Sequence, residues 1–162
     1  MNGSCWIVES PIGPLTLWEE NGHLTELHFG VSDAAEPFLQ KTPLFQEANR
    51  QLDAYFAGAL QCFDLPLAPK GTAFQQACWR VLLEIPYGQT RSYAEQAAAI
   101  GNPKATRAVG MANHRNPLPI LIPCHRVVGK DGKLTGYAGG IHIKAYLLNL
   151  ELAATAENRR KL

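Results

Sequence analysis

A stretch rich in proline and glycine near the middle of the chain limits how much of it can fold as one unit. Residues 59–71 include Pro66, Pro69 and Gly71, and we expect a short strand followed by a linker there. The chain of 162 residues is long enough for one medium domain or two small ones. We therefore predict two domains, residues 1–70 and residues 71–162.

The two expected domains differ in charge. Residues 1–70 carry nine acidic and three basic side chains, whereas residues 71–162 carry five acidic and twelve basic side chains. The net charges are −6 and +7, a division that the total of +1 hides. A basic half favours a polyanionic partner, although chance segregation on two solvated surfaces would give the same counts.

The first domain is expected to contain short strands and one helix. Three segments have the pattern of strands: residues 5–10, 14–19 and 23–29. Asn21-Gly22 is typical of a hairpin turn. Apolar residues recur at helical spacing over residues 44–57, and Gly58 would end this helix.

Helices dominate the second half. Thr72 is a candidate N-cap for a helix that ends before Pro86, and residues 141–152 have the pattern of a last helix. Ser92-Tyr-Ala-Glu95 is a capping box that opens a helix ending at Gly101. Asn102-Pro103 is expected to open the next helix.

Two short helices joined by a turn that contains glycine suggest a helix-turn-helix. The second of them carries basic side chains in or near it: Lys104, Arg107 and Arg115. Many helix hairpins bind nothing, so the motif gains weight for DNA binding only together with the basic charge.

Residues 116–128 cannot form a regular helix, because Pro117, Pro119 and Pro123 interrupt them, and we expect an extended chain. Cys124 lies in this segment, followed by His125 and Arg126. A thiol is a nucleophile only as the thiolate, which a neighbouring imidazole or cation favours. A buried cysteine beside a chance histidine gives the same run, and neighbouring side chains of an extended chain point to opposite faces.

The other three cysteines are interpreted as small core residues: Cys5, Cys62 and Cys78. Their spacing matches no zinc motif, and disulfides are not expected.

Six motifs in the second half are shared with a known family. They are Phe74-Gln-Gln, Ile85-Pro-Tyr-Gly-Gln-Thr-Arg-Ser-Tyr93, Gly101-Asn-Pro-Lys-Ala-Thr-Arg-Ala-Val-Gly110, Asn116-Pro, Ile122-Pro-Cys-His-Arg-Val-Val-Gly129 and Leu134-Thr-Gly-Tyr-Ala-Gly-Gly140. Residues 72–151 thereby resemble the catalytic domain of the O6-alkylguanine-DNA alkyltransferases (methylated-DNA–protein-cysteine methyltransferases), bacterial members in particular. The first half agrees less specifically. Some family members bind a structural zinc in that half, for which Cys5 and His28 would be candidate ligands, but no second cysteine is placed beside them, so we predict no metal.

The resemblance implies an α+β fold. The N-terminal domain would be small and α/β with an antiparallel, ribonuclease-H-like sheet, and the C-terminal domain mostly helical and winged-helix-like. It also implies DNA repair, in which the alkyl group of O6-alkylguanine in double-stranded DNA moves irreversibly to Cys124, once per molecule. The nucleotide would be flipped out from the minor groove. The preferred alkyl size and activity on O4-alkylthymine stay open.

Four residues receive catalytic roles from the resemblance. Cys124 would accept the alkyl group, His125 would take its proton through a water, and Glu151 would orient the imidazole. Asn116 would stiffen the backbone under Cys124. Taken alone, Glu151 would be interpreted as a surface carboxylate of a helix.

Seven further residues are assigned to the nucleotide or to DNA: Tyr93, Arg107, Asn113, Arg126, Val127, Tyr137 and Ala138. Arg107 would fill the place of the flipped base, and Tyr93 would help to rotate the nucleotide out. Ala138 stands where some relatives have serine, so only its backbone N–H can donate. Asn113 replaces an apolar pocket residue of other members, which leaves the range of accepted alkyl groups open.

Two other functions fit parts of the sequence. A cysteine hydrolase would use Cys124 and His125, but it leaves the basic half without a role. A non-catalytic module that senses damaged DNA would keep Arg107 and Tyr93 without needing a reactive thiol. Intact-mass measurement after reaction separates a hydrolase, which returns to its starting mass, from an acceptor, which does not.

No cofactor is expected. No apolar run approaches the roughly 20 residues that a membrane-spanning helix needs, and the N-terminus lacks the pattern of a signal peptide. We therefore expect a cytoplasmic protein without membrane contact. It is expected to be a monomer, and cooperative assembly on DNA stays open.

Overall fold

The computed structural model describes residues 3–160, with side chains up to Asn158. The chain divides into two compact units, Met1–Lys70 and Gly71–Leu162. The first contains an antiparallel sheet and one α-helix, and the second contains four α-helices. The predicted α+β class is confirmed.

The sheet of the first unit consists of β1 (Ser4–Val8), β2 (Leu15–Glu20) and β3 (His23–Phe29), paired antiparallel in that order. Asn21 and Gly22 join β2 to β3 with φ angles of 53° and 77°. Positive φ at both central residues is what a type I′ hairpin turn requires, so the predicted hairpin is present.

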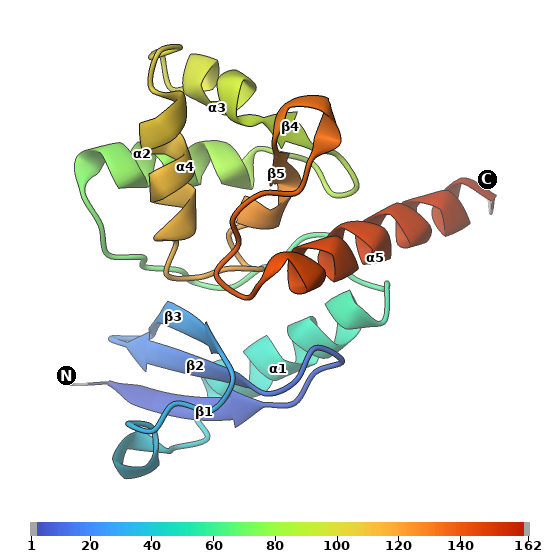
Figure 1. The fold of residues 1–162 in the computed structure, drawn as a ribbon. Coiled ribbons are helices and arrows are strands. Elements are labelled where there is room, and N and C mark those ends of the chain that lie inside the picture. The colour runs from blue at the N-terminus through green and yellow to red at the C-terminus, as the bar shows by residue number, and fades with distance from the viewer. Residues whose placement is uncertain (1–2, 161–162) are drawn as a thin grey trace. The chain divides into compact units, whose positions relative to one another are not determined.

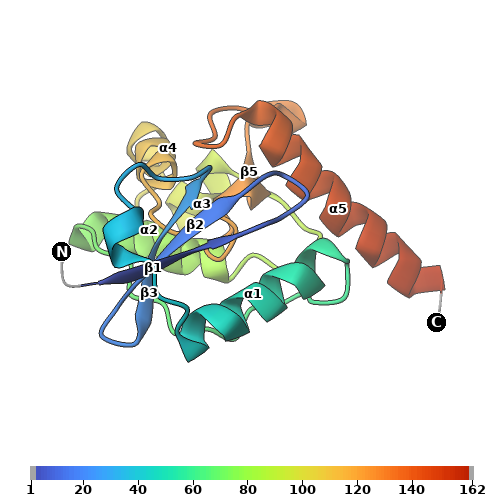
Figure 2. The ribbon, with the colours of Figure 1, turned by 90° about the horizontal axis from the view of Figure 1, so that it is seen from below.

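Helix α1 (Pro43–Phe56) follows a short 3₁₀ turn, η1 (Glu36–Phe38). The hydroxyl of Thr42 accepts a hydrogen bond from the backbone N–H of Phe45 and so caps α1. Figure 2 shows α1 lying beside the sheet. The buried face of α1 carries the expected apolar residues: Phe45, Ala48, Leu52, Tyr55 and Phe56.

Two expectations for residues 59–71 were wrong. Instead of a strand there is a single parallel bridge between Leu24 and Leu67, in which Leu24 N donates to the carbonyl of Pro66. Pro66 and Pro69 have no N–H and cannot extend this ladder, which explains why it stops after one bridge. Cys62 is exposed in this loop and is not a core residue.

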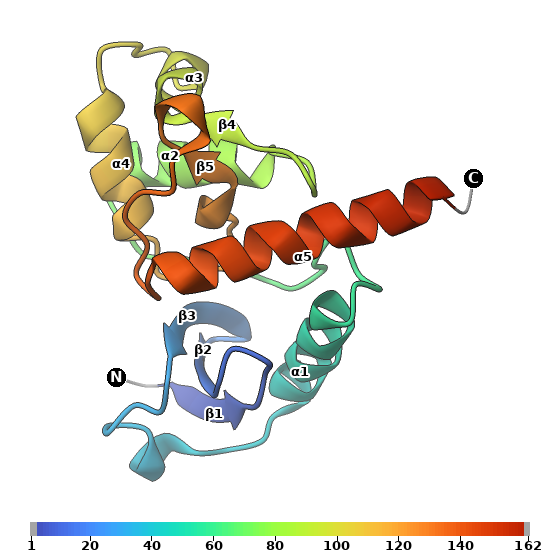
Figure 3. The same cartoon turned by 45° about the vertical axis from the view of Figure 1, so that its right-hand side comes forward.

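The second unit is built on α2 (Ala73–Leu83), α3 (Tyr93–Ala99), α4 (Thr106–His114) and α5 (Ile141–Arg160). The capping boxes at the starts of α2 and α3 are both present. Figures 1 and 3 show α3 and α4 as a helix pair joined by a short turn. Trp79 of α2 is buried and donates from Nε1 to the carbonyl of Ala112 at 2.9 Å, which fixes α2 against α4.

The structure corrects two helix boundaries. Helix α4 begins at Thr106 rather than at Asn102, because Ala105 N bonds to Asn102 O and closes a turn around Pro103. Proline favours this second position of a turn. Helix α5 continues to Arg160, beyond the expected end at residue 152.

The segment after α4 is also less extended than expected. Cys124–Arg126 form a 3₁₀ turn, η2, followed by the strand β5 (Val127–Val128). Strand β5 pairs in parallel with β4 (Arg91–Ser92). A second 3₁₀ turn, η3 (Lys130–Gly132), lies before the glycine-rich loop. Across the described part of the chain, no helix has the length and apolar character needed to cross a membrane.

Candidate active site

The backbone that leads to Cys124 is held in place by Asn116. This side chain is 7% exposed and donates from Nδ2 to the carbonyl of Ile122 at 2.8 Å, while its Oδ1 accepts from Leu118 N at 2.9 Å. The two bonds span the turn in which Ile120 has a φ of 74°, an unfavourable value for a β-branched residue. The first bond ties Asn116 to the backbone two residues before Cys124.

Cys124 lies at a pocket within the second unit and is 8% exposed. The pocket is lined by Tyr93, Asn113, His114, Asn116, Pro119, Cys124, Gly136, Tyr137 and Ala138. Burial raises the pKa of the Cys124 thiol to about 11, although a hydrogen bond from Asn116 and the charge of Lys144 act in the opposite direction. At neutral pH the resting group is therefore the thiol, and its reaction needs a base.

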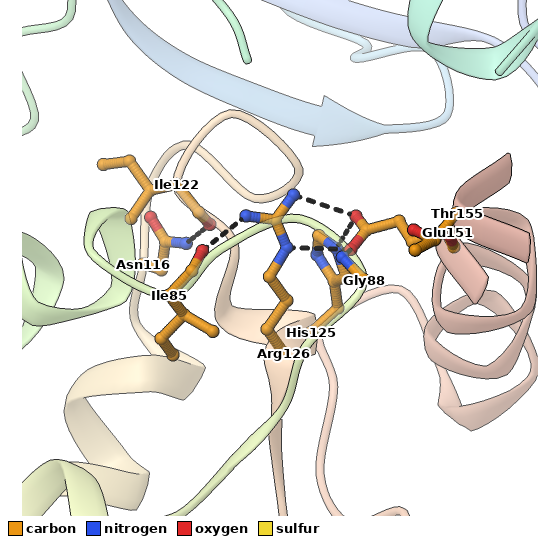
Figure 4. A network of polar contacts seen from close by, with 8 residues as sticks. All are labelled: Ile85, Gly88, Asn116, Ile122, His125, Arg126, Glu151 and Thr155. Carbon is orange, nitrogen blue, oxygen red and sulfur yellow. Dashed lines mark hydrogen bonds and ion pairs between the residues drawn. The ribbon is translucent and has the colours of Figure 1, made fainter. Parts of the chain in front are cut away.

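His125 is the nearest base in the sequence, and it is fully buried. Its Nε2 lies 2.6 Å from Oε2 of Glu151 on α5 (Figure 4). Burial lowers the pKa of His125, although the hydrogen bond and charge of Glu151 raise it, so the imidazole is neutral near pH 7. Because a carboxylate only accepts, Nε2 carries the proton and Nδ1 is left with a free lone pair.

Nδ1 of His125 has no hydrogen-bond partner among the described residues. Cys124 and His125 are therefore not joined by a direct hydrogen bond through this nitrogen. The interpretation of Glu151 as a surface carboxylate, made from the helix pattern alone, is wrong, since this residue is 1% exposed.

Glu151 is also the ion-pair partner of Arg126. The guanidinium donates from Nε to Oε1 at 2.8 Å, from Nη2 to Oε2 at 3.1 Å and from Nη1 to the carbonyl of Ile85 at 2.8 Å. Burial raises the pKa of Glu151, but the hydrogen bonds and charges of His125 and Arg126 outweigh it and lower the value to about 2. Glu151 is thus ionised, and Arg126 balances its charge.

The assignment of Arg126 to nucleotide or DNA contact needs correction. The residue is 7% exposed and its guanidinium bonds inside the unit (Figure 4). A buried, bidentate arginine of this kind holds a carboxylate in place rather than a phosphate.

Sequence reasoning missed Lys144, which is 1% exposed in the first turns of α5. Its Nζ donates to the carbonyl of Thr135 at 2.9 Å and lies 5.9 Å from the centre of the Tyr93 ring. The hydroxyl of Thr135 in turn donates to Tyr93 Oη at 3.1 Å. Burial lowers the pKa of Lys144, and the nearby Cys124 raises it. An isolated lysine in a helix is normally solvated, so the sequence contains no signal for this burial.

The remaining predicted residues lie in three places. Asn113, Tyr137, Ala138 and Tyr93 line the Cys124 pocket, and the Tyr137 side chain is largely buried. Val127 is buried in β5 directly after the 3₁₀ turn. Arg107 lies apart from these, exposed on α4, the second helix of the helix pair.

No cluster of three or more potential metal ligands occurs among residues 3–160 with described side chains. Cys5, one of the two candidate ligands, is buried and donates from Sγ to the carbonyl of Ala35. His28, the other candidate, is exposed.

Comparison with known proteins assigns both units. Residues 73–153 match the family model "6-O-methylguanine DNA methyltransferase, DNA binding domain", and residues 5–69 match "6-O-methylguanine DNA methyltransferase, ribonuclease-like domain". The methylated-DNA–protein-cysteine methyltransferase of Methanosarcina acetivorans is 53% identical over 149 residues, 90% of this chain and 96% of that protein. The constitutive one of Bacillus subtilis is 51% identical over 151 residues, 88% of this chain and 92% of that protein.

Solved structures agree. The crystal structure of Mycobacterium tuberculosis OGT in complex with DNA has a TM-score of 0.85 and 50% identity, and covers 93% of this chain and 94% of that one. The M. tuberculosis O6-methylguanine methyltransferase has a TM-score of 0.84 and 49% identity, with 94% of each chain covered. The chain therefore belongs to the family of methylated-DNA–protein-cysteine methyltransferases, the DNA repair alkyltransferases.

Proposed function

We propose that this protein repairs DNA by moving the alkyl group from O6-alkylguanine to the sulfur of its own Cys124, once per molecule. The observation that carries the proposal is the placement of Cys124 in a pocket, with the neutral His125 directly after it hydrogen-bonded to the ionised Glu151. A thiol of high pKa beside a neutral imidazole is suited to proton removal at the moment of reaction.

The transfer step requires the thiolate. Nδ1 of His125 takes the proton of Cys124 through a water, and the imidazolium that forms is stabilised by the carboxylate of Glu151, 2.6 Å from Nε2. The sulfur attacks the alkyl carbon, a C–S bond forms, and the C–O6 bond breaks with its electron pair going to the guanine. The guanine then takes up a proton, so the reaction as a whole exchanges the thiol hydrogen for the alkyl group.

The base must leave the duplex to reach this thiol, because Cys124 is only 8% exposed. We infer that the nucleotide is flipped into the pocket from the minor groove, at a cost of a few kcal/mol. Arg107, exposed on α4, would take the place of the base in the stack, and Tyr93 at the pocket would guide the nucleotide. Tyr137, the backbone N–H of Ala138 and the backbone carbonyls of Cys124 and Val127 would hold the base.

Double-stranded DNA is the proposed partner. Lys104, Arg107 and Arg115 are exposed on or beside α4, and residues 71–162 carry a net charge of +7. Neutralising several phosphates releases counterions, so the affinity should fall steeply with salt. We propose that the protein is a monomer. Cooperative binding along DNA and reaction with O4-alkylthymine would be further properties of the same DNA-repair activity.

The experiment is incubation with DNA that carries a single O6-methylguanine, followed by intact-mass measurement. One methyl group should appear on each protein molecule, on the peptide that contains Cys124, and Cys124→Ser should gain none while still binding DNA. The variant Cys62→Ser removes an exposed cysteine and serves as the matched control, which should be methylated like the unmodified protein. Complete repair by substoichiometric protein without any mass increase would contradict the proposal and favour a hydrolase.

A further inference from the structure

One polar side chain at the Cys124 pocket has no part in the transfer step. Asn113 of α4 is 7% exposed and lines this pocket. Its amide exchanges two hydrogen bonds with the amide of Gln96 on α3. Gln96 Nε2 donates to Asn113 Oδ1 at 2.9 Å, and Asn113 Nδ2 donates to Gln96 Oε1 at 2.7 Å. Gln96 is 1% exposed, so the pair joins the two helices behind the pocket wall.

The orientation of this amide pair is fixed by a third hydrogen bond. Gln96 Nε2 also donates to the backbone carbonyl of Cys78 at 3.2 Å. Because a carbonyl only accepts, the nitrogen of the Gln96 amide must face α2 and cannot exchange places with the oxygen. Asn113 can then turn its own amide over only by losing both bonds to Gln96. Gln96 is in this sense a positioning residue for Asn113.

The pairing leaves hydrogen-bonding capacity on Asn113. One N–H of Nδ2 and one lone pair of Oδ1 have no partner among the side chains and backbone that the structure describes. When a bound group shields an N–H donor from water and offers it no acceptor, the donor loses a hydrogen bond. The affinity for that group then falls by about tenfold or more. A benzyl group on O6 would cover more of the pocket wall than a methyl group, and it carries no hydrogen-bond acceptor for the amide.

We propose that the Gln96–Asn113 pair makes the Cys124 pocket selective for small alkyl groups on O6 of guanine. The inference rests on the proposed function, since it concerns which alkyl groups that reaction accepts. Asn113 supplies the polar wall, and Gln96 keeps the Asn113 amide from turning its unpaired N–H away from a large apolar group.

The test compares two free bases, O6-methylguanine and O6-benzylguanine. The rate at which each modifies Cys124 is measured by intact mass at several base concentrations. Asn113→Leu has a similar volume and no polar atom, and it should raise the benzyl-to-methyl rate ratio about tenfold. Gln96→Met leaves Asn113 in place but frees its amide, and it should raise the ratio by a smaller factor, about threefold. Gln89→Met, the same substitution at an exposed site of this unit, should leave the ratio unchanged.

The outcomes separate this inference from the proposed function. An unchanged ratio in Asn113→Leu overturns the inference, and an unchanged ratio in Gln96→Met overturns the positioning role of Gln96. If thermal unfolding shows that Asn113→Leu does not fold, the benzyl-to-methyl rate ratio is measured for Asn113→Ala instead, because alanine is a strong helix former and suits α4. An unchanged ratio in that variant would then overturn the inference. Failure of the unmodified protein to gain a methyl group from O6-methylguanine in DNA would instead overturn the proposed function.

Discussion

Replacing Glu151 with glutamine should destabilise the second unit strongly, although the two side chains have the same shape. Oε1 of Glu151 accepts from Arg126 Nε at 2.8 Å and from Gly88 N at 3.3 Å, and Oε2 accepts from His125 Nε2 at 2.6 Å and from Arg126 Nη2 at 3.1 Å. Whichever oxygen becomes an NH₂ group, it then faces an N–H of Arg126, which can only donate. Glu151→Gln also leaves the charge of Arg126 buried without a counterion.

The magnitude follows from the burial of both partners. Glu151 is 1% exposed and Arg126 7% exposed. Removing one partner of such a pair costs about 3–5 kcal/mol. For a domain of this size 1 kcal/mol lowers the melting temperature by about 4–8 °C, so we expect a fall of at least ~12 °C.

Thermal unfolding followed by the helical circular dichroism signal measures this change. Glu157→Gln, an exposed carboxylate on the same helix, is the matched control and should shift the midpoint little. The pKa of Glu151 is lowered to about 2 from its usual 4.5, so its contribution to stability is complete above pH 4.5 and is lost as the pH falls towards 2. The difference in melting temperature between Glu151→Gln and the unmodified protein should therefore become smaller in acid. A fall of less than about 4 °C at neutral pH, or a difference that does not narrow, would refute the reasoning.

Three further predictions concern reactivity. Arg107→Ala should slow repair of O6-methylguanine in duplex DNA about tenfold at saturating DNA and leave the reaction with the free base unchanged; equal slowing of both would assign Arg107 to the fold or the pocket. Burial lowers the pKa of His125 from its usual 6.5 despite the opposing effect of Glu151, so the transfer rate should fall in acid with a midpoint below pH 6.5, and a midpoint above 6.5 would contradict His125 as the base. Iodoacetamide at neutral pH should modify the exposed Cys62 before Cys124, whose pKa is about 11; peptide mass spectrometry showing Cys124 modified first would contradict the protonated resting thiol.

The fold was predictable wherever local chemistry decides it. The hairpin at Asn21-Gly22, the N-cap at Thr72 and the capping box at Ser92 are determined by residues within four positions of each other, and all three are present. The parallel pairing of β4 with β5 joins strands of two residues each that lie far apart in the sequence, and neither strand is long enough to show a pattern. Tertiary packing alone specifies such a pair.

The site shows the same difference between features determined by local sequence and features determined by tertiary packing. Asn116 and Glu151 gained their roles only from the family resemblance, because the partners that bury them lie on other segments. Lys144 and Gln96 gave no signal at all, since an isolated lysine or glutamine in a helix is normally a solvated residue. Their burial depends on the loop at Thr135 and on the carbonyl of Cys78, neither of which the helix pattern contains.

The contacts of Arg126 have a geometric cause that also explains the site. In an extended chain side chains alternate, so Arg126 would share a face with Cys124, and His125 would point away from both. A 3₁₀ turn instead rotates successive side chains by about 120°. Cys124 can then face the pocket while His125 and Arg126 both reach the carboxylate of Glu151. The three prolines of this segment exclude an α-helix but permit a single tight turn. Because of that turn, the buried carboxylate of Glu151 can both orient the base His125 and neutralise the charge of Arg126.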